Sequence, residues 1–95
     1  MPTQRTVTIG SRLGLHARPA TLFVKAVNET GLPVFIARPD QAPVDARSML
    51  AVMALGANHG ETVTLTCDDT DTDADAADRA LDGLVDLLAS DMDTA

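Results

Sequence analysis

The sequence has almost no aromatic residues: two phenylalanines stand among 95 residues, and tryptophan and tyrosine are missing. The core must therefore consist of aliphatic side chains and alanine, which an apolar fraction of 45% can supply for a single domain over residues 1–95. Long hydrophobic runs are lacking as well, so we expect no insertion into a membrane. A charged and then apolar leader, typical of secreted proteins, is also missing.

Cysteine is nearly absent too. The lone Cys67 cannot form an internal disulfide, which favours a reducing, cytoplasmic environment. Its place in an alternating strand pattern predicts a buried, small apolar side chain. The chain has no nucleotide-binding loop, no paired catalytic carboxylates and no histidine and cysteine spacing of a metal site. We therefore expect neither a cofactor nor a metal.

The charge of −7 is unevenly distributed. Residues 1–47 carry six cations and three acids, a net charge of +3, whereas residues 48–95 carry one cation and eleven acids, a net charge of −10. A strongly acidic second half argues against binding to nucleic acid. A basic region in the first half would instead attract an acidic partner.

The run Gly14-Leu15-His16-Ala17-Arg18-Pro19 carries most of the chemistry in the sequence. Proline is favoured in the first turn of a helix, so His16 is predicted at a helix N-terminus, where unpaired N–H groups favour an anion. Arg18 adds a planar cation that suits phosphate oxygens. This combination indicates phosphoryl chemistry on His16, and the alternative is a histidine that merely caps the helix.

Hydrophobic periodicity predicts the order β-α-β-β-α-β-α. The expected strands are 5–9, 33–37, 42–45 and 61–67, and the expected helices are 17–28, 49–55 and 74–89. Pro43 cannot donate to a strand ladder, which places the third strand at a sheet edge. Residues 68–73 are predicted to form a polar loop, and residues 91–95 a frayed tail. The order alone also fits a ferredoxin-like binding domain with an added helix.

The second helix has a recognisable start. Ser48 is predicted to be its N-cap, and Gly56 to end it. The apolar Met49, Leu50 and Met53 either pack into the core or form an exposed patch. His59 lies between polar residues and glycine, and we interpret it as a surface residue.

Three segments together resemble the HPr family, the histidine-containing phosphocarriers of the sugar phosphotransferase system. Residues 14–19 resemble its active-site motif, residues 47–56 its regulatory-serine helix, and residues 60–65 the strand that follows. The resemblance covers about residues 5–90. It implies an α+β open-faced β-sandwich, with a four-stranded antiparallel sheet in the order 1-4-2-3 covered on one face by three helices.

The resemblance also implies a function. His16 would accept a phosphoryl group on Nδ1 (a pros-phosphohistidine) from Enzyme I and pass it to a sugar-specific IIA domain, or to the related subunit of a dihydroxyacetone kinase. Arg18 would neutralise charge, and the backbone N–H groups of Ala17 and Arg18 would hold the phosphoryl oxygens. Such a protein is a monomeric carrier rather than an enzyme.

Further residues follow from the same resemblance. Ser48 would be the target of an HPr kinase, and the alternative function is a regulatory HPr-like binding protein switched at this serine. The partner-binding surface would comprise Arg12, Thr21, Lys25, Arg47, Met49, Leu50 and Met53. Two positions depart from the family pattern: Leu13 replaces a small polar residue, and Arg47 replaces a lysine.

Overall fold

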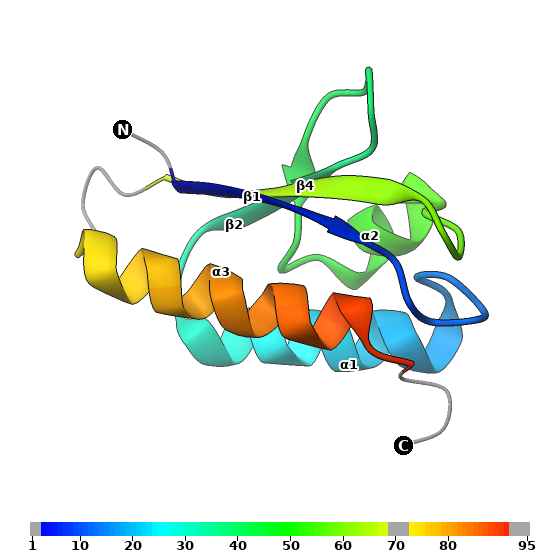
Figure 1. Cartoon of the computed structure of the whole chain (residues 1–95), viewed down its shortest axis with the longest axis horizontal. Coiled ribbons are helices and arrows are strands. Elements are labelled where there is room, and N and C mark those ends of the chain that lie inside the picture. Colours follow the sequence, from blue (N-terminus) through cyan, green and yellow to red (C-terminus); the bar gives the residue numbers. More distant parts are fainter. Residues whose placement is uncertain (1–2, 69–72, 92–95) are drawn as a thin grey trace.

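The computed structural model describes residues 3–68 and 73–91. It contains four strands and three helices in the predicted order (Figure 1). The elements are β1 (Thr3–Thr8), α1 (Ala17–Thr30), β2 (Val34–Ala37), β3 (Val44–Asp45), α2 (Met49–Leu55), β4 (Thr62–Cys67) and α3 (Ala74–Ala89). The polar loop predicted at residues 68–73 falls mostly outside the described residues, as does the predicted tail beyond Asp91.

All strand pairs are antiparallel, and the sheet order is β1-β4-β2-β3. The topology expected from the family resemblance is therefore confirmed. The third strand is shorter than predicted, because it begins at Val44 rather than at residue 42. It does lie at the sheet edge, as the proline before it requires.

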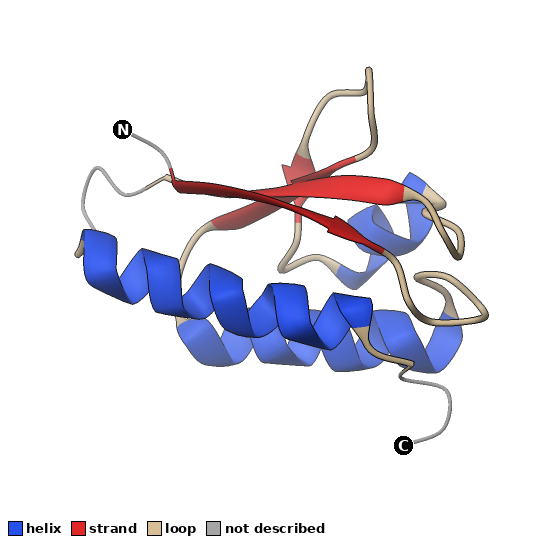
Figure 2. Ribbon diagram, viewed as in Figure 1, coloured by secondary structure: helices blue, strands red, loops and turns tan. Residues whose placement is uncertain are grey.

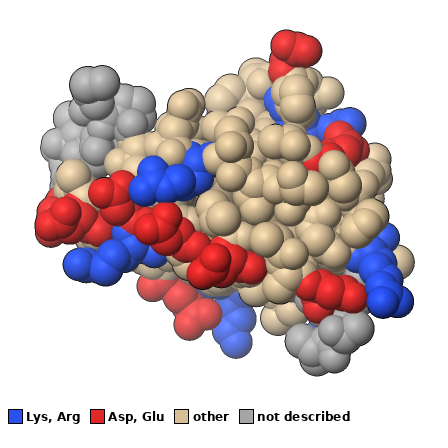
Figure 3. Space-filling view, in the orientation of Figure 1, with Lys and Arg blue, Asp and Glu red and all other residues tan. Residues whose placement is uncertain are grey.

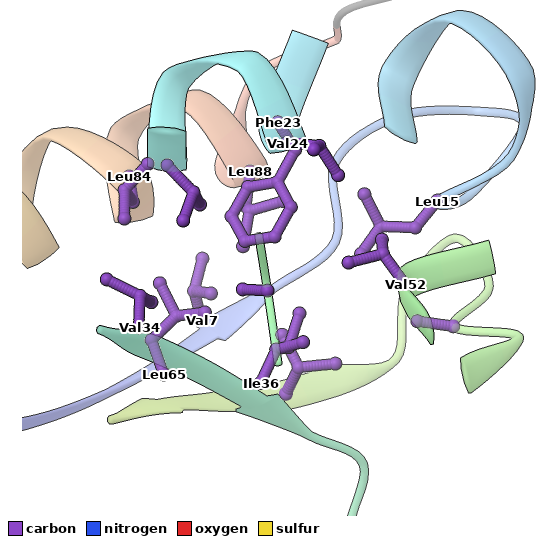
Figure 4. Packing of buried hydrophobic residues seen from close by; sticks show 14 of the residues in the cluster. Val7, Leu15, Phe23, Val24, Val34, Ile36, Val52, Leu65, Leu84 and Leu88 are labelled. Carbon is purple, nitrogen blue, oxygen red and sulfur yellow. The ribbon is translucent and has the colours of Figure 1, made fainter. Parts of the chain in front are cut away.

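The three helices cover one face of the sheet, which leaves the other face open (Figure 2). Along β4 the side chains alternate, with Val63, Leu65 and Cys67 buried and Thr62 exposed. Phe23 of α1 is fully buried among aliphatic side chains above the sheet (Figure 4). The core is thus aliphatic around one aromatic ring, and Cys67 is buried as predicted.

The helix ends follow the sequence signals closely. Ser48 caps α2 by accepting a hydrogen bond from the Ala51 N–H at 3.2 Å, and Gly56 ends that helix with φ 70°. Helix α1 ends at Thr30, two residues later than the predicted end at residue 28, and Gly31 closes it in the same left-handed conformation. Asp73 caps α3 through the Asp75 N–H at 3.1 Å.

Acidic side chains run along the outer face of α3 (Figure 3). Two of them are tied to the sheet: Arg5 of β1 contacts Asp78 at 2.9 Å and Asp82 at 3.1 Å. The hydrogen bonds that Arg5 donates to both carboxylates raise its pKa. All three groups are solvent-exposed in part, so the pairs orient α3 on β1 more than they stabilise the fold.

The C-terminal end of α3 packs directly against the loop that follows β1. The Gly10 N–H donates to the Leu88 carbonyl at 2.8 Å. A Cβ at Gly10 would lie 2.0 Å from the Ala89 carbonyl oxygen, far inside the contact distance of a carbon and an oxygen that are not bonded to each other. Only glycine therefore allows the two backbones to approach this closely. The salt bridge from Arg12 to Asp91, at 3.3 Å, adds a second contact between this loop and the residue that follows the end of α3 and Ser90.

We expect Gly10→Ala to lower the free energy of unfolding by about 1–3 kcal/mol, because α3 must shift to accommodate the methyl group. Gly83→Ala is the matched control, since a Cβ at Gly83 meets nothing within 4 Å. In a helix interior it should instead stabilise by about 0.5–1 kcal/mol. Urea unfolding of both variants measures the difference. Equal effects of the two substitutions would contradict the close packing at Gly10.

Candidate functional site

His16 lies between β1 and α1 and is the N-cap residue of α1, as the sequence predicts. Its backbone is extended, with φ −126° and ψ 157°, and its side chain makes no capping hydrogen bond. The first N–H groups of a helix have no partner within the helix, and the helix dipole favours negative charge at this end. The half-buried imidazole therefore stands beside backbone groups suited to an anion.

Ala17 has a positive φ of 47°, which alanine rarely adopts. A non-glycine residue in this region costs about 1–3 kcal/mol, so the surrounding structure must hold it there. Thr21 donates its hydroxyl to the Ala17 carbonyl at 3.1 Å, one turn further along α1. The backbone next to His16 is thus strained and fixed. Sequence reasoning missed this feature, because alanine signals an ordinary helix.

The segment 9–15 is hydrogen-bonded to the loop 57–61, which precedes β4. Three backbone hydrogen bonds of 2.9 Å join them: Ile9 N–H to Glu61 O, Gly60 N–H to Ile9 O, and Leu15 N–H to Ala57 O. A Cβ at Gly14, whose φ is 72°, would lie 2.6 Å from the Ala57 carbonyl oxygen. The buried Leu15 points toward Val52 of α2 (Figure 4). The chain that carries His16 is therefore anchored immediately before the histidine.

The cations singled out in the sequence fall into two groups. Arg12 pairs with Asp91, and Arg47 pairs with Asp45 at 3.1 Å. Hydrogen bonds from Arg47 lower the pKa of Asp45. Within residues 3–68 and 73–91, Arg18 has no acidic side chain at ion-pair distance. The same holds for Lys25, which lies about two turns further along α1.

The three apolar residues of α2 divide between the core and the surface. Met49 packs against the buried cluster. Leu50 is 83% exposed and Met53 is 40% exposed, so both present apolar surface to solvent. Leu13 is 61% exposed, in the loop that carries His16. Both interpretations of the sequence therefore hold, for different residues.

A cluster around Glu61 was not found from the sequence. Arg38 donates to Glu61 Oε2 through Nη2 at 2.6 Å and Nε at 2.9 Å, and Asn58 donates to Oε1 through its backbone N–H at 3.0 Å and its side-chain amide at 2.8 Å. Arg38 also reaches the Leu55 carbonyl at 3.4 Å. Partial burial alone would raise the pKa of Glu61, but the hydrogen bonds from Asn58 and Arg38 outweigh it, and the pKa is lowered.

His59 is exposed, as predicted, but it is not without a contact. Its Nδ1 lies 3.0 Å from the carbonyl oxygen of the fully buried Ser11. No group of three or more metal ligands occurs in the part of the chain that the structure describes. No helix among those residues is long and apolar enough to cross a bilayer.

The fold and the His16 loop together define an open-faced β-sandwich whose site lies on its surface. A family model described as "PTS HPr component phosphorylation site" matches residues 3–90. The phosphocarrier protein HPr of Streptomyces coelicolor is 47% identical over 90 residues, which cover 95% of this chain and 91% of that protein. The chain belongs to the HPr family of phosphocarrier proteins.

Other relatives agree with this assignment. The phosphocarrier protein HPr of Haloferax volcanii is 43% identical over 88 residues, covering 92% of this chain and 93% of that protein. The crystal structure of HPr from Bacillus anthracis has a TM-score of 0.79 at 32% identity, covering 92% of this chain and 96% of that one. The HPr-like protein Crh of Bacillus subtilis is 39% identical over 62 residues, covering 65% of this chain and 72% of that protein.

We expect the stability contributed by Glu61 to be lost in acid. Because its pKa is lower in the folded state, the contribution is complete above the ordinary value of 4.5 and is lost as the pH falls through the folded pKa. Glu61→Gln should therefore lower the melting temperature at pH 7, and the difference from wild type should shrink progressively as the pH falls below 4.5. Thermal unfolding of both proteins across this range measures the effect, and a constant difference at all pH values would contradict it.

Proposed function

We propose that His16 accepts a phosphoryl group from phosphorylated Enzyme I and passes it to a sugar-specific IIA domain. The observation that supports this most strongly is the position of His16 at the N-terminus of α1, where its side chain makes no capping hydrogen bond. Nearby Arg18 has no acidic partner among the described residues. A second acceptor of the same chemistry would be the related subunit of a dihydroxyacetone kinase. Membership of the HPr family supports the proposal.

The transfer needs the neutral imidazole. The lone pair of Nδ1 attacks phosphorus, the bond from phosphorus to the donor breaks, and its electron pair returns to the donor. The reverse exchange with the acceptor returns His16 to its starting state. The protein is therefore a phosphorylated intermediate of the pathway rather than its catalyst.

Arg18 and the backbone supply the positive field for this step. The guanidinium of Arg18 would neutralise the phosphoryl oxygens as they arrive and leave. The N–H groups of Ala17 and Arg18, at the start of α1, would donate hydrogen bonds to them. The strained φ of Ala17 is consistent with a backbone shaped for this purpose.

The partners would dock on the surface around His16. Leu50 and Met53 offer exposed apolar contacts, and methionine adapts to several surfaces. Thr21 and Lys25 are exposed on α1, and Arg12 and Arg47 add charge although each is paired within the chain. We infer a monomer in the cytoplasm, where Enzyme I and IIA domains would meet it.

The alternative is a regulatory binding protein switched by phosphorylation of Ser48. Ser48 is only half-buried, and its hydroxyl caps α2. Relatives named HPr-like protein Crh match this chain over 62 and 68 residues, whereas the Streptomyces carrier matches over 90. The longer match, together with the presence of His16 and Arg18, favours the carrier.

We expect His16→Ala to abolish acid-labile phosphorylation by Enzyme I and phosphoenolpyruvate while the fold is kept. The other histidine provides the control, because His59→Ala should still take up the label in full once the reaction has reached its end point, whatever its rate. Transfer of labelled phosphate, with circular dichroism of each variant, is the measurement. Label that depends on His59 and not on His16 would overturn the assignment, and a wild-type protein that takes up none would favour the regulatory alternative.

Arg18→Ala should slow both uptake and release of the phosphoryl group, because charge stabilisation of about 2–4 kcal/mol is lost in the transition state. Arg79→Ala on α3 removes the same charge far along the sequence and controls for the net charge. Single-turnover transfer at saturating Enzyme I measures the rate. Equal rates for the two variants would reject the proposed role of Arg18.

A further inference from the structure

The carbonyl of Ser11 receives two hydrogen bonds from different parts of the chain. The Gly14 N–H donates at 3.1 Å and closes the turn 11–14, and the His59 ring contacts the same oxygen through Nδ1 at 3.0 Å. A carbonyl oxygen has two lone pairs, so both bonds can form together. Ser11 is fully buried and His59 is exposed, so the contact between them is partly buried.

The loop that carries His59 is itself held by hydrogen bonds to the side chain of Glu61. Glu61 accepts two hydrogen bonds from Asn58, and Arg38 clamps the other oxygen of the same carboxylate. On the other side of the histidine, the Gly60 N–H donates to the Ile9 carbonyl. The residues on both sides of His59 are thus fixed, and its ring projects from a rigid support.

The turn that His59 contacts leads directly to His16. Gly14 ends the turn in a left-handed conformation, and Leu15 then enters the core with no exposed surface. His16 follows at once, with its strained neighbour Ala17. A displacement of the turn would therefore pass to the imidazole of His16 within two residues.

We propose that His59 is a positioning residue for phosphoryl transfer: its Nδ1–H, bonded to the Ser11 carbonyl, braces the 11–14 turn and so fixes the orientation of His16. This inference rests on the proposed function of His16. The bond holds the neutral ring of His59 in the tautomer with the proton on Nδ1. The protonated ring also donates from Nδ1, so the brace does not depend on the charge of His59.

Three substitutions at His59 separate the hydrogen bond from the rest of the ring. Asparagine places an N–H donor near the position of Nδ1, glutamine places its donor further out, and alanine removes the donor. His59→Ala and His59→Gln should lower the transfer rate at saturating Enzyme I about three- to tenfold, with KM unchanged. His59→Asn should restore the rate to within about twofold of wild type. Gln41→Ala, in an exposed turn, controls for truncation of a surface side chain and should transfer at the wild-type rate.

Two measurements without Enzyme I test the brace itself. Nitrogen-15 spectra of wild type should show His59 with the proton on Nδ1 at high pH. The amide of Gly14 should exchange with solvent about three- to tenfold faster in His59→Ala than in wild type, and at the wild-type rate in His59→Asn. A proton on Nε2 in wild type, or unchanged exchange at Gly14, would overturn the brace.

The kinetic outcomes are equally separable. Transfer rates in His59→Ala equal to those of wild type would overturn the positioning role. A change in KM alone would overturn it too, because it would show that His59 contacts Enzyme I directly. The same loss in His59→Asn as in His59→Ala would overturn the role of the Nδ1 donor. A wild-type protein that takes up no phosphoryl group would overturn the proposed function itself, which is a different result from an active wild type and an equally active His59→Ala.

Discussion

The site depends on one constraint: the segment 9–15 is held between the loop 57–61 and the C-terminal end of α3. On one side, the loop 57–61 contributes three backbone hydrogen bonds. On the other, the end of α3 comes so close that Gly10 cannot carry a side chain. Neither support is near His16 in sequence. The histidine is thus placed by residues some forty and seventy positions away, and the local motif supplies His16 and Arg18 but not their fixed geometry.

The charged side chains divide into those paired within the chain and those without an ion pair among the described residues. The acidic face of α3 is partly neutralised by Arg5, and the basic Arg12 and Arg47 are each held by an acid of this chain. Surface pairs of this kind contribute little stability, but they reduce the field of the charges they contain. Among the described residues, the positive field at the start of α1 therefore comes chiefly from Arg18 and the helix dipole, with Lys25 about two turns further along the helix. The positive charge at this helix end is therefore small and localised on a protein whose net charge is −7.

Much of this could be predicted from the sequence, because the signals are local. Ser48 begins α2 as its N-cap, Gly31 and Gly56 end α1 and α2, and the alternation along β4 shows its buried face directly. The sheet order came from the family resemblance and not from periodicity. The cluster of Arg38, Asn58 and Glu61 and the contact of His59 with Ser11 could not be found, because each joins residues whose proximity only the folded topology creates. The positive φ of Ala17 was hidden for the opposite reason: its local signal is that of an ordinary helix.

An open site places a special demand on the backbone beneath it. A phosphoryl group that must be passed to another protein cannot be enclosed, so side chains packed around it cannot supply the rigidity that a buried active site has. In this chain the rigidity comes from the segment that precedes His16, through backbone hydrogen bonds, the close contacts of Gly10 and Gly14, and the core residue Leu15. The strained Ala17 can persist only on such a support, because a mobile loop would relax it at little cost. The partial exposure of His16 therefore depends on the tight anchoring of the segment before it.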